Sequence, residues 1–292
     1  MQVNHILKLY YGIQEEIEPP QYFHFQNQLY YFSYVQNPHI FLEIFQYYRY
    51  LIQNCQCPGY SLVKNNNEDV ISYQHVLLVY HDYDFHFQNY LTSFLQPIPH
   101  QRLFIYQIKE QWICKIDSVK ELVKQYAYSF KHNPELVSLI YYYTGLAENC
   151  INILNEILSI HKNASITMGL ALKHTISDYV HELLNPMNYV ISSRMRHLVY
   201  LLRSQLLTYD MLEQLLETHY FDVYEILYFY ARLFFPSHFF NEVLSQKISQ
   251  ERIDSYFVYI EEERKMYQEI TKILSFYVTL PKISWINKKN MI

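Results

Sequence analysis

Four polar residues between positions 170 and 203 have side chains of the types that phosphoryl transfer uses: His174, Asp178, Asn185 and Asn188. In that reaction a carboxylate accepts the proton of the attacking hydroxyl, and carboxylate and carboxamide oxygens hold magnesium against the phosphates. Asp178 is the one carboxylate of the four, so it is a candidate base, with a helix cap or a surface position as the alternative. The segment 185–188 offers two carboxamides but no carboxylate to bind a metal.

The layout of residues 170–203 resembles the catalytic segment of aminoglycoside kinases. That segment has a His-Gly-Asp loop, then an Asn, a strand with a metal-binding Asp, and a helix. Thr175 and Ile176 follow His174 where the pattern has Gly and Asp. The resemblance implies a loop that has lost its base and its metal ligand and so cannot stabilise a transferring phosphoryl group. We predict a vestigial site of His174, Asp178, Asn185 and Asn188. In it, His174 bonds the backbone of the following turn at the floor of a cleft between two lobes.

Three further motifs resemble those of the CotS/YutH group of endospore coat-associated proteins. They are Ile108–Trp112, Tyr141–Asn149 and the run YARLFFPSHFF at 230–240. The resemblance implies the fold of aminoglycoside and choline kinases, a role in sporulation, and protein partners in a spore coat assembly. It also implies a location in the mother-cell cytoplasm or on the spore coat. The YutH-like branch lacks the His-Gly-Asp loop, and in this respect the chain resembles that branch.

Other parts of a nucleotide site are missing as well. The strand expected at 29–35 has no Lys to pair with Glu43 on the next helix, and the nearby Lys64 sits by a turn. The 4 glycines stand alone, so there is no glycine loop to let backbone amides approach phosphates. We therefore expect no cofactor and a non-catalytic, kinase-like protein (a pseudokinase) that acts by binding. The alternatives are a small-molecule phosphotransferase with a rearranged active site and a scaffold without a ligand cleft.

Composition limits the partners. The chain has 292 residues, of which 50% are apolar and 17% charged, as expected of a folded globular protein. Its net charge of -5 argues against nucleic-acid binding by bulk electrostatics and against a polybasic membrane patch. Charged and proline positions interrupt the most apolar region, 226–243, so we expect no membrane insertion. The N-terminus has no signal-peptide pattern, and a cytosolic chain with reduced thiols is expected.

Tyrosine is abundant, with 32 residues. The abundance fits either the codon bias of a low-GC genome or a tyrosine-rich surface in a packed assembly. The 4 cysteines lack the spacing of a zinc site. Neither feature identifies a partner or an oligomeric state.

The periodicity predicts an α+β chain with the two-lobe order of protein kinases: a small mixed β-lobe over 1–82 and a large helical lobe over 83–292. Strands are expected at 21–25, 29–35, 60–63, 70–73 and 76–80, with a helix at 39–54. Helices follow at 85–96, 107–131, 134–160, 194–207, 209–217, 220–235, 237–246 and 249–279, with Asp210 and Ser249 as N-caps. Between them, 167–173 and 189–191 are the only extended candidates.

Four other groups of residues have two interpretations each. The segment 81–86, HDYDFH, is either a metal cluster or a solvated linker. Glu148 and Asn149 line a pocket or serve helix packing. Arg232 and His238 flank Pro236, where Arg232 could bond the carbonyls that proline leaves free. The basic group near 194–203 is a phosphate site or a solvated helix face; it consists of Arg194, Arg196, His197 and Arg203.

Overall fold

The computed structural model describes residues 3–14, 17, 20–125, 133–177, 179–218, 221–246 and 248–287. It is an α+β protein with small antiparallel sheets, so this part of the predicted fold class is confirmed. The chain forms two compact units: unit 1 contains residues 1–99 and 169–200, and unit 2 contains 100–168 and 201–292. The predicted lobe boundaries, 1–82 and 83–292, stay predictions.

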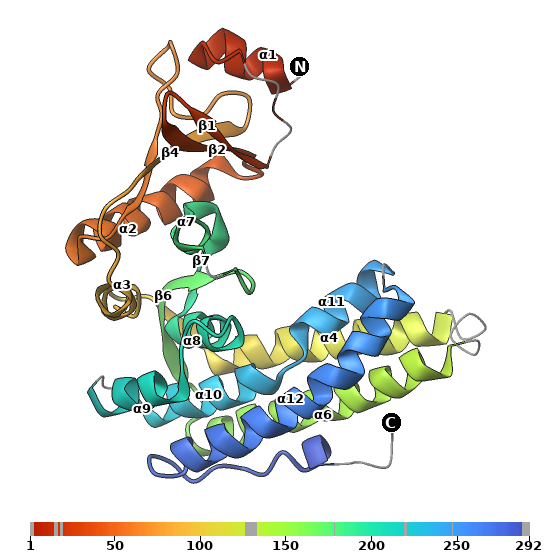
Figure 1. Cartoon of the computed structure of the whole chain (residues 1–292). Helices are drawn as coiled ribbons and strands as arrows, with labels where there is room; N and C mark the ends of the chain where they lie inside the picture. The colour runs from red at the N-terminus through yellow and green to blue at the C-terminus, as the bar shows by residue number, and fades with distance from the viewer. Residues whose placement is uncertain are drawn as a thin grey trace. The chain divides into compact units, whose positions relative to one another are not determined.

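Unit 1 is built on a four-stranded antiparallel sheet with the order β1-β2-β4-β3 (Figure 1). Its strands are β1 (Gln21–Phe25), β2 (Gln28–Tyr34), β3 (Gly59–Leu62) and β4 (His75–His81). Gln26 and Asn27 connect the first two strands with φ of 50° and 62°. Two consecutive positive φ angles match the twist of a tight hairpin, so the predicted hairpin is confirmed.

The expected strand at 70–73 is wrong. In this segment only Ser72 pairs, in an isolated antiparallel bridge with His75. Tyr73 and Gln74 lie between them with φ of 48° and 59°, so these residues form a two-residue turn that leads directly into β4. The apolar pattern of 70–73 is typical of a strand, but the chain uses Tyr73 for the turn that precedes β4.

Unit 1 also contains several helices. The short helix α1 (Val3–Ile6) continues into the π-helix η1 (Leu7–Tyr11), whose Ile6 and Leu7 form a buried cluster with Phe23, Phe32 and Leu77. The helix α2 (Pro38–Cys55) begins at Asn37, whose side chain accepts from the backbone N–H of Ile40. The helix α3 is Phe87–Phe94.

The second segment of unit 1 contains the end of β6 (Ser165–Leu172), α7 (Val180–Leu183), the 3-10 turn η2 (Pro186–Asn188), β7 (Tyr189–Ser193) and the start of α8 (Arg194–Arg203). Here lies a buried polar group. The hydroxyl of Tyr90 is 2.9 Å from that of Tyr189 and 3.1 Å from Nε2 of His197. Tyr189 donates to the Leu183 carbonyl at 2.6 Å, so it accepts from Tyr90, and Nε2–H of His197 then donates to Tyr90.

Unit 2 is helical apart from the pair formed by β5 (Arg102–Phe104) and the start of β6. Long helices α4 (Ile105–Gln125) and α6 (Pro134–Ile160) pack together, and α10 (Val223–Phe234) and α12 (Gln250–Leu274) also pack on α6 (Figure 1). The helices α9 (Tyr209–Thr218) and α11 (Ser237–Ser245) and the short η3 (Ser284–Asn287) complete it. None of the helices in the described ranges has both the length and the apolar composition of a membrane span.

The predicted cap at Ser249 is confirmed, because its hydroxyl accepts from the N–H of Arg252 at 3.3 Å. The predicted cap at Asp210 is wrong. Asp210 is the second residue of α9, and the hydroxyl of Thr208 accepts from the N–H of Met211 at 3.2 Å instead. Both residue types suit an N-cap, and the chain uses the hydroxyl two positions earlier.

Candidate functional site

The turn between β6 and β7, residues 173–188, is centred on Asn185, whose side chain is 1% exposed. Its Oδ1 accepts from the N–H of Met187 at 2.9 Å and so caps η2. Its Nδ2 donates to the hydroxyl of Tyr22 on β1 at 2.8 Å. The carboxamide therefore joins the turn to the sheet of unit 1, and a buried polar group in such a place stabilises only while its partners stay in position.

The rest of the turn is also tied to backbone groups. Asn188 donates through Nδ2 to the Glu182 carbonyl at 2.8 Å, and its own carbonyl accepts from the N–H of Lys173 at 2.9 Å. The ammonium of Lys173 donates to the Met187 carbonyl at 2.9 Å. Burial, and secondarily the charge of Arg196, lowers the pKa of Lys173. This cation is held by the turn itself.

His174 bonds locally, with Nδ1 2.8 Å from the carbonyl oxygen of Thr175. The predicted bond to the backbone that follows is thus present, and the imidazole is exposed. Its place at the floor of a cleft between two lobes stays a prediction. An exposed ring can exchange its partner for water, and it costs little to remove. Asp178, the candidate base, lies outside the described residues.

Glu182 is the one described carboxylate between 173 and 188, and it accepts a hydrogen bond from the hydroxyl of Ser177. Its charge contributes to the raised pKa of Tyr22, which reaches about 12 mainly because the phenol is buried. Glu182 thus stabilises the first half of the turn by bonding a neighbour five residues away. The hydrogen bonds of the Lys173, Ser177, Asn185 and Asn188 side chains go to a neighbour in the turn, to its backbone, or to Tyr22.

Sequence reasoning missed His181, which brings the turn against the sheet. The Tyr22 ring meets the His181 ring edge-on at 5.0 Å between centroids, and Tyr80 does so at 6.5 Å. Tyr22 and Tyr80 share one face of the sheet, because side chains alternate along strands and the register pairs Tyr22 with Tyr31 and Tyr31 with Leu78. This alternation was readable in the sequence, but its partner in the turn was not.

The structure also places Lys64, Glu43 and the segment 81–86, which were considered as parts of a phosphate or metal site. Lys64 forms an exposed ion pair with Glu68 at 2.6 Å, in the turn where the sequence placed it. Glu43 on α2 is exposed. The described residues contain no group of three or more His, Cys, Asp or Glu side chains arranged to hold a metal ion, and this includes the segment 81–86.

The motif at 141–149 serves packing in unit 2. Glu148 pairs with Lys120 of α4 at 2.8 Å, as the packing interpretation expects. The Oδ1 of Asn149 accepts from the N–H of Trp285 at 3.1 Å. A Cβ at Gly145 would lie 2.1 Å from Cε2 of Trp285, so this glycine makes room for the indole. The motif therefore packs against the segment around η3. Its residues alone did not indicate that Trp285 would be the partner.

The basic group near 194–203 is not a solvated helix face, so that interpretation is wrong. His197 is fully buried, and Arg194, Arg196 and Arg203 are half-buried. Arg196 donates to the carbonyls of Leu172 at 3.1 Å and Lys173 at 3.0 Å. Arg196 thus satisfies backbone carbonyls at the end of β6.

Polar side chains near Pro236 bond across neighbouring helices, and the expected bond of Arg232 to carbonyls that proline leaves free stays a prediction. Arg232 donates to the hydroxyl of Ser237 at 3.0 Å, while Arg203 of α8 donates to the Leu233 carbonyl in the last turn of α10. His238 lies 2.9 Å from the Tyr256 hydroxyl. The region around Pro236 is therefore a packing junction of α10, α11 and α12, with Trp112 stacked on Phe235 at 4.0 Å between centroids.

Comparison of the chain with protein-family models, with curated proteins and with solved structures finds no match. The resemblance to the coat-associated group therefore still rests on the motifs quoted above. What the chain does has to be argued from its own residues.

Proposed function

We propose that the chain is a non-catalytic protein with a kinase-like two-lobe fold that acts by binding, as a coat-associated protein of endospores. One observation carries the non-catalytic part. In the turn 173–188, where a kinase would present its base and its metal ligands, the side chains of Lys173, Ser177, Glu182, Asn185 and Asn188 are hydrogen-bonded within the turn or to Tyr22. Asn185 is the central case, because its amide caps η2 and bonds Tyr22.

The chemistry of phosphoryl transfer explains why this matters. Catalysis of that reaction rests on positioned charge: a carboxylate at the attacking hydroxyl and metal ions on the phosphates. Ile176 occupies the position expected for the base, and an isoleucine can neither accept a proton nor hold a cation. The carboxamide of Asn185 is neutral and already bonded, so it brings no charge to a metal site.

The kinase-like part of the proposal is supported by the order of elements along the chain. A β-hairpin (β1, β2), a helix (α2) and two further strands (β3, β4) precede a mostly helical remainder. The short strand β5 comes before α4, and a strand, turn and strand at β6, η2 and β7 come before α8. This order of elements agrees with the kinase-like order expected from the amino-acid sequence.

Nucleotide binding tests the non-catalytic part. The melting temperature of the full chain is measured with ATP and magnesium, with magnesium alone, and with an active aminoglycoside kinase as positive control. A ligand that binds only the native state raises the melting temperature by mass action, so we expect a shift for the control and none for this chain. A shift with ATP and magnesium, accompanied by phosphate transfer to a hydroxylated substrate, would establish the phosphotransferase alternative.

Localisation tests the coat-associated part separately. A fluorescent fusion of the full chain is produced in an endospore-forming host during sporulation, beside the fluorescent protein alone. We expect the fusion to gather at the spore surface and the control to stay diffuse. A diffuse fusion would refute coat association and leave the non-catalytic proposal untouched.

A further inference from the structure

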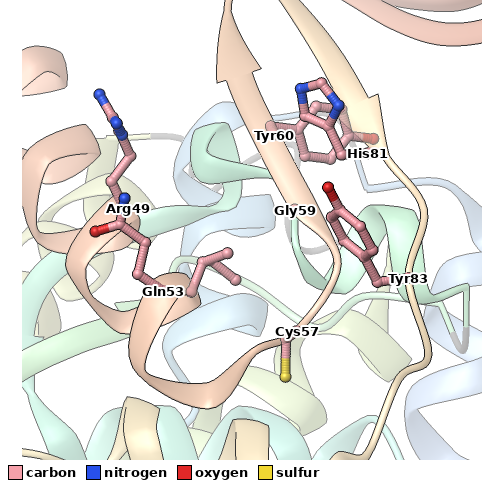
Figure 2. Close-up of a pocket in the computed structure, with 8 residues that line it drawn as sticks. Arg49, Gln53, Cys57, Gly59, Tyr60, His81 and Tyr83 are labelled. Atoms are coloured by element: carbon pink, nitrogen blue, oxygen red, sulfur yellow. The ribbon is translucent and has the colours of Figure 1, made fainter.

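A pocket opens in unit 1 between α2 and the adjoining ends of β3 and β4, with a volume of about 290 Å³. Figure 2 shows Arg49 and Gln53 projecting from α2 on one side, and Tyr60, His81 and Tyr83 on the strand side. Ile52 adds an apolar side chain to the wall. The volume suits a small ligand of one ring and one polar group and is at the lower end of ordinary small-molecule sites.

The close approach of β3 to α2 shapes this pocket. A Cβ at Gly59 would lie 2.8 Å from the Tyr48 hydroxyl and 2.9 Å from Cγ2 of Ile52. Only a glycine lets the strand begin so near the helix, and the hydroxyl of Tyr48 then accepts from the N–H of Tyr60 at 2.8 Å. The start of β3 is therefore held against α2 at the base of the pocket.

The polar side chains of the lining include the guanidinium of Arg49 and the carboxamide of Gln53, both of which can donate hydrogen bonds. Arg49 and Gln53 are four residues apart on α2, so they lie on the same face of that helix. Within the described part of the chain, neither has a hydrogen-bond or ion-pair partner. No carboxylate lines the pocket, so the charge of Arg49 is not compensated there. An uncompensated guanidinium favours a bidentate partner such as a carboxylate or a phosphate.

The imidazole of His81 is held in the pocket wall. Its Nε2 is 2.6 Å from the hydroxyl of Ser61. This bond restrains the ring and leaves its other nitrogen for a ligand. The phenol of Tyr83 is 66% exposed and supplies a further ring and hydroxyl at the rim.

We propose that this pocket binds a small organic oxyanion, a carboxylate or phosphate carried on a planar apolar group. The anion pairs with Arg49 and takes further hydrogen bonds from Gln53 and His81. The apolar group lies against Ile52 and the ring of Tyr83. The specificity rests on charge and size, because the pocket has one free cation among its described lining and room for about one ring.

The pocket is separate from the turn 173–188. Side chains alternate along a strand, so His81 faces the side of the sheet opposite to its neighbour Tyr80, which contacts His181 of the turn. Binding at Arg49 is therefore independent of whether the turn ever served phosphoryl transfer, and of whether the protein associates with a spore coat.

Ligand-observed NMR on the full chain tests the proposal with three probes: benzoate, phenyl phosphate and the neutral analogue benzamide. We expect saturable binding of at least one anion and no saturation by benzamide. Binding should weaken as ionic strength rises, because Arg49 is exposed and its charge is screened. The anion that saturates identifies the carboxylate or the phosphate as the preferred group.

Variants assign the site. Arg49→Gln keeps the length and polarity of the side chain but removes the charge, and it should weaken anion binding by about tenfold or more, as expected for a charge-assisted hydrogen bond. His81→Phe should weaken it by a smaller factor. Lys265→Gln, at an exposed cation of α12 in unit 2, is the matched control and should leave binding unchanged. Circular dichroism confirms that each variant is folded.

Several results would overturn the proposal. Neither anion saturates, benzamide binds as tightly as benzoate, or Arg49→Gln binds the anions as the parent does. An equal loss of binding in Arg49→Gln and Lys265→Gln would also count against it, because it would show only a general effect of net charge.

Discussion

Replacement of Gly145 by alanine should destabilise unit 2, although the same change in an ordinary helix stabilises. Gly145 lies within α6, where alanine is favoured over glycine by about 1 kcal/mol. Here the new methyl group would lie 2.1 to 2.5 Å from three atoms of the Trp285 indole. Because contacts this short cannot persist, the indole has to leave its seat on α6.

The size of the effect follows from the area that the indole covers. A buried aromatic side chain removes roughly 150–250 Å² from water, which at about 25 cal/mol per Å² corresponds to roughly 4–6 kcal/mol. Trp285 is only partly buried, so we expect a loss of about 2–4 kcal/mol. The helix preference offsets about 1 kcal/mol of this, which leaves a net destabilisation of roughly 1–3 kcal/mol.

A double-mutant cycle separates these terms. Urea denaturation is followed by circular dichroism for the parent, Gly145→Ala, Trp285→Ala and the double variant. In the Trp285→Ala background the clash is gone, so Gly145→Ala should now stabilise by up to about 1 kcal/mol. The coupling energy between the two sites should therefore be about 2–4 kcal/mol.

The sign of the stability change caused by Gly145→Ala shows whether the indole of Trp285 packs on Gly145. If Gly145→Ala is as stable as the parent or more stable, the indole does not occupy the seat on α6. If Gly145→Ala has the same effect in both backgrounds, the coupling is zero and the destabilisation has another cause.

Three further predictions concern single groups. The pKa of His197 is lowered to about 3 by burial, whereas the unfolded chain protonates this residue near its ordinary value of 6.5. The stabilising contribution of the neutral ring is therefore complete above pH 6.5 and is lost as pH falls, by up to about 1.4 kcal/mol per pH unit. Urea midpoints between pH 7 and 5.5 should fall less in His197→Gln than in the parent, and equal slopes would contradict this. Asn185→Ala should cost roughly 1–3 kcal/mol, because it removes a buried side chain that bonds the half-buried Tyr22 hydroxyl and the backbone N–H of Met187. His174→Ala at an exposed site should cost under about 0.5 kcal/mol, and the reverse order in urea denaturation would refute the account of the turn. In thiol labelling of the native protein, exposed Cys114 should react well before buried Cys150, whose thiol pKa is raised by burial, and simultaneous reaction would show that α6 opens readily.

The buried tyrosines bear on the two explanations for the composition of the chain. Tyr48, Tyr90, Tyr142, Tyr143, Tyr189 and Tyr230 are among the largest side chains that are fully buried. Several of their hydroxyls have specific partners, such as the backbone N–H of Tyr60 for Tyr48 and the Leu183 carbonyl for Tyr189. Some of the tyrosines therefore form part of the protein interior, and this holds for either explanation of their abundance.

Local rules predicted most elements correctly. The hairpin at β1 and β2 followed from two aromatic and β-branched runs separated by a short polar turn, and α6 followed from its helical period over 134–160. The errors arose where two local signals competed. At 70–73 an apolar run suggested a strand where the chain makes a turn, and at α9 Thr208 and Asp210 were both suitable caps.

The α+β class, the positions of most helices and the lack of an acidic residue next to His174 could be read from the residues alone, because these features depend on neighbours within a few positions. The partners of the polar side chains became known only from the folded chain. Asn185 meets Tyr22 across 163 positions, and Asn149 meets Trp285 across 136. The pocket at Arg49 likewise needs α2, β3 and β4 together. Burial and hydrogen bonding are set by such distant contacts, and no local pattern specifies which distant residue will supply them.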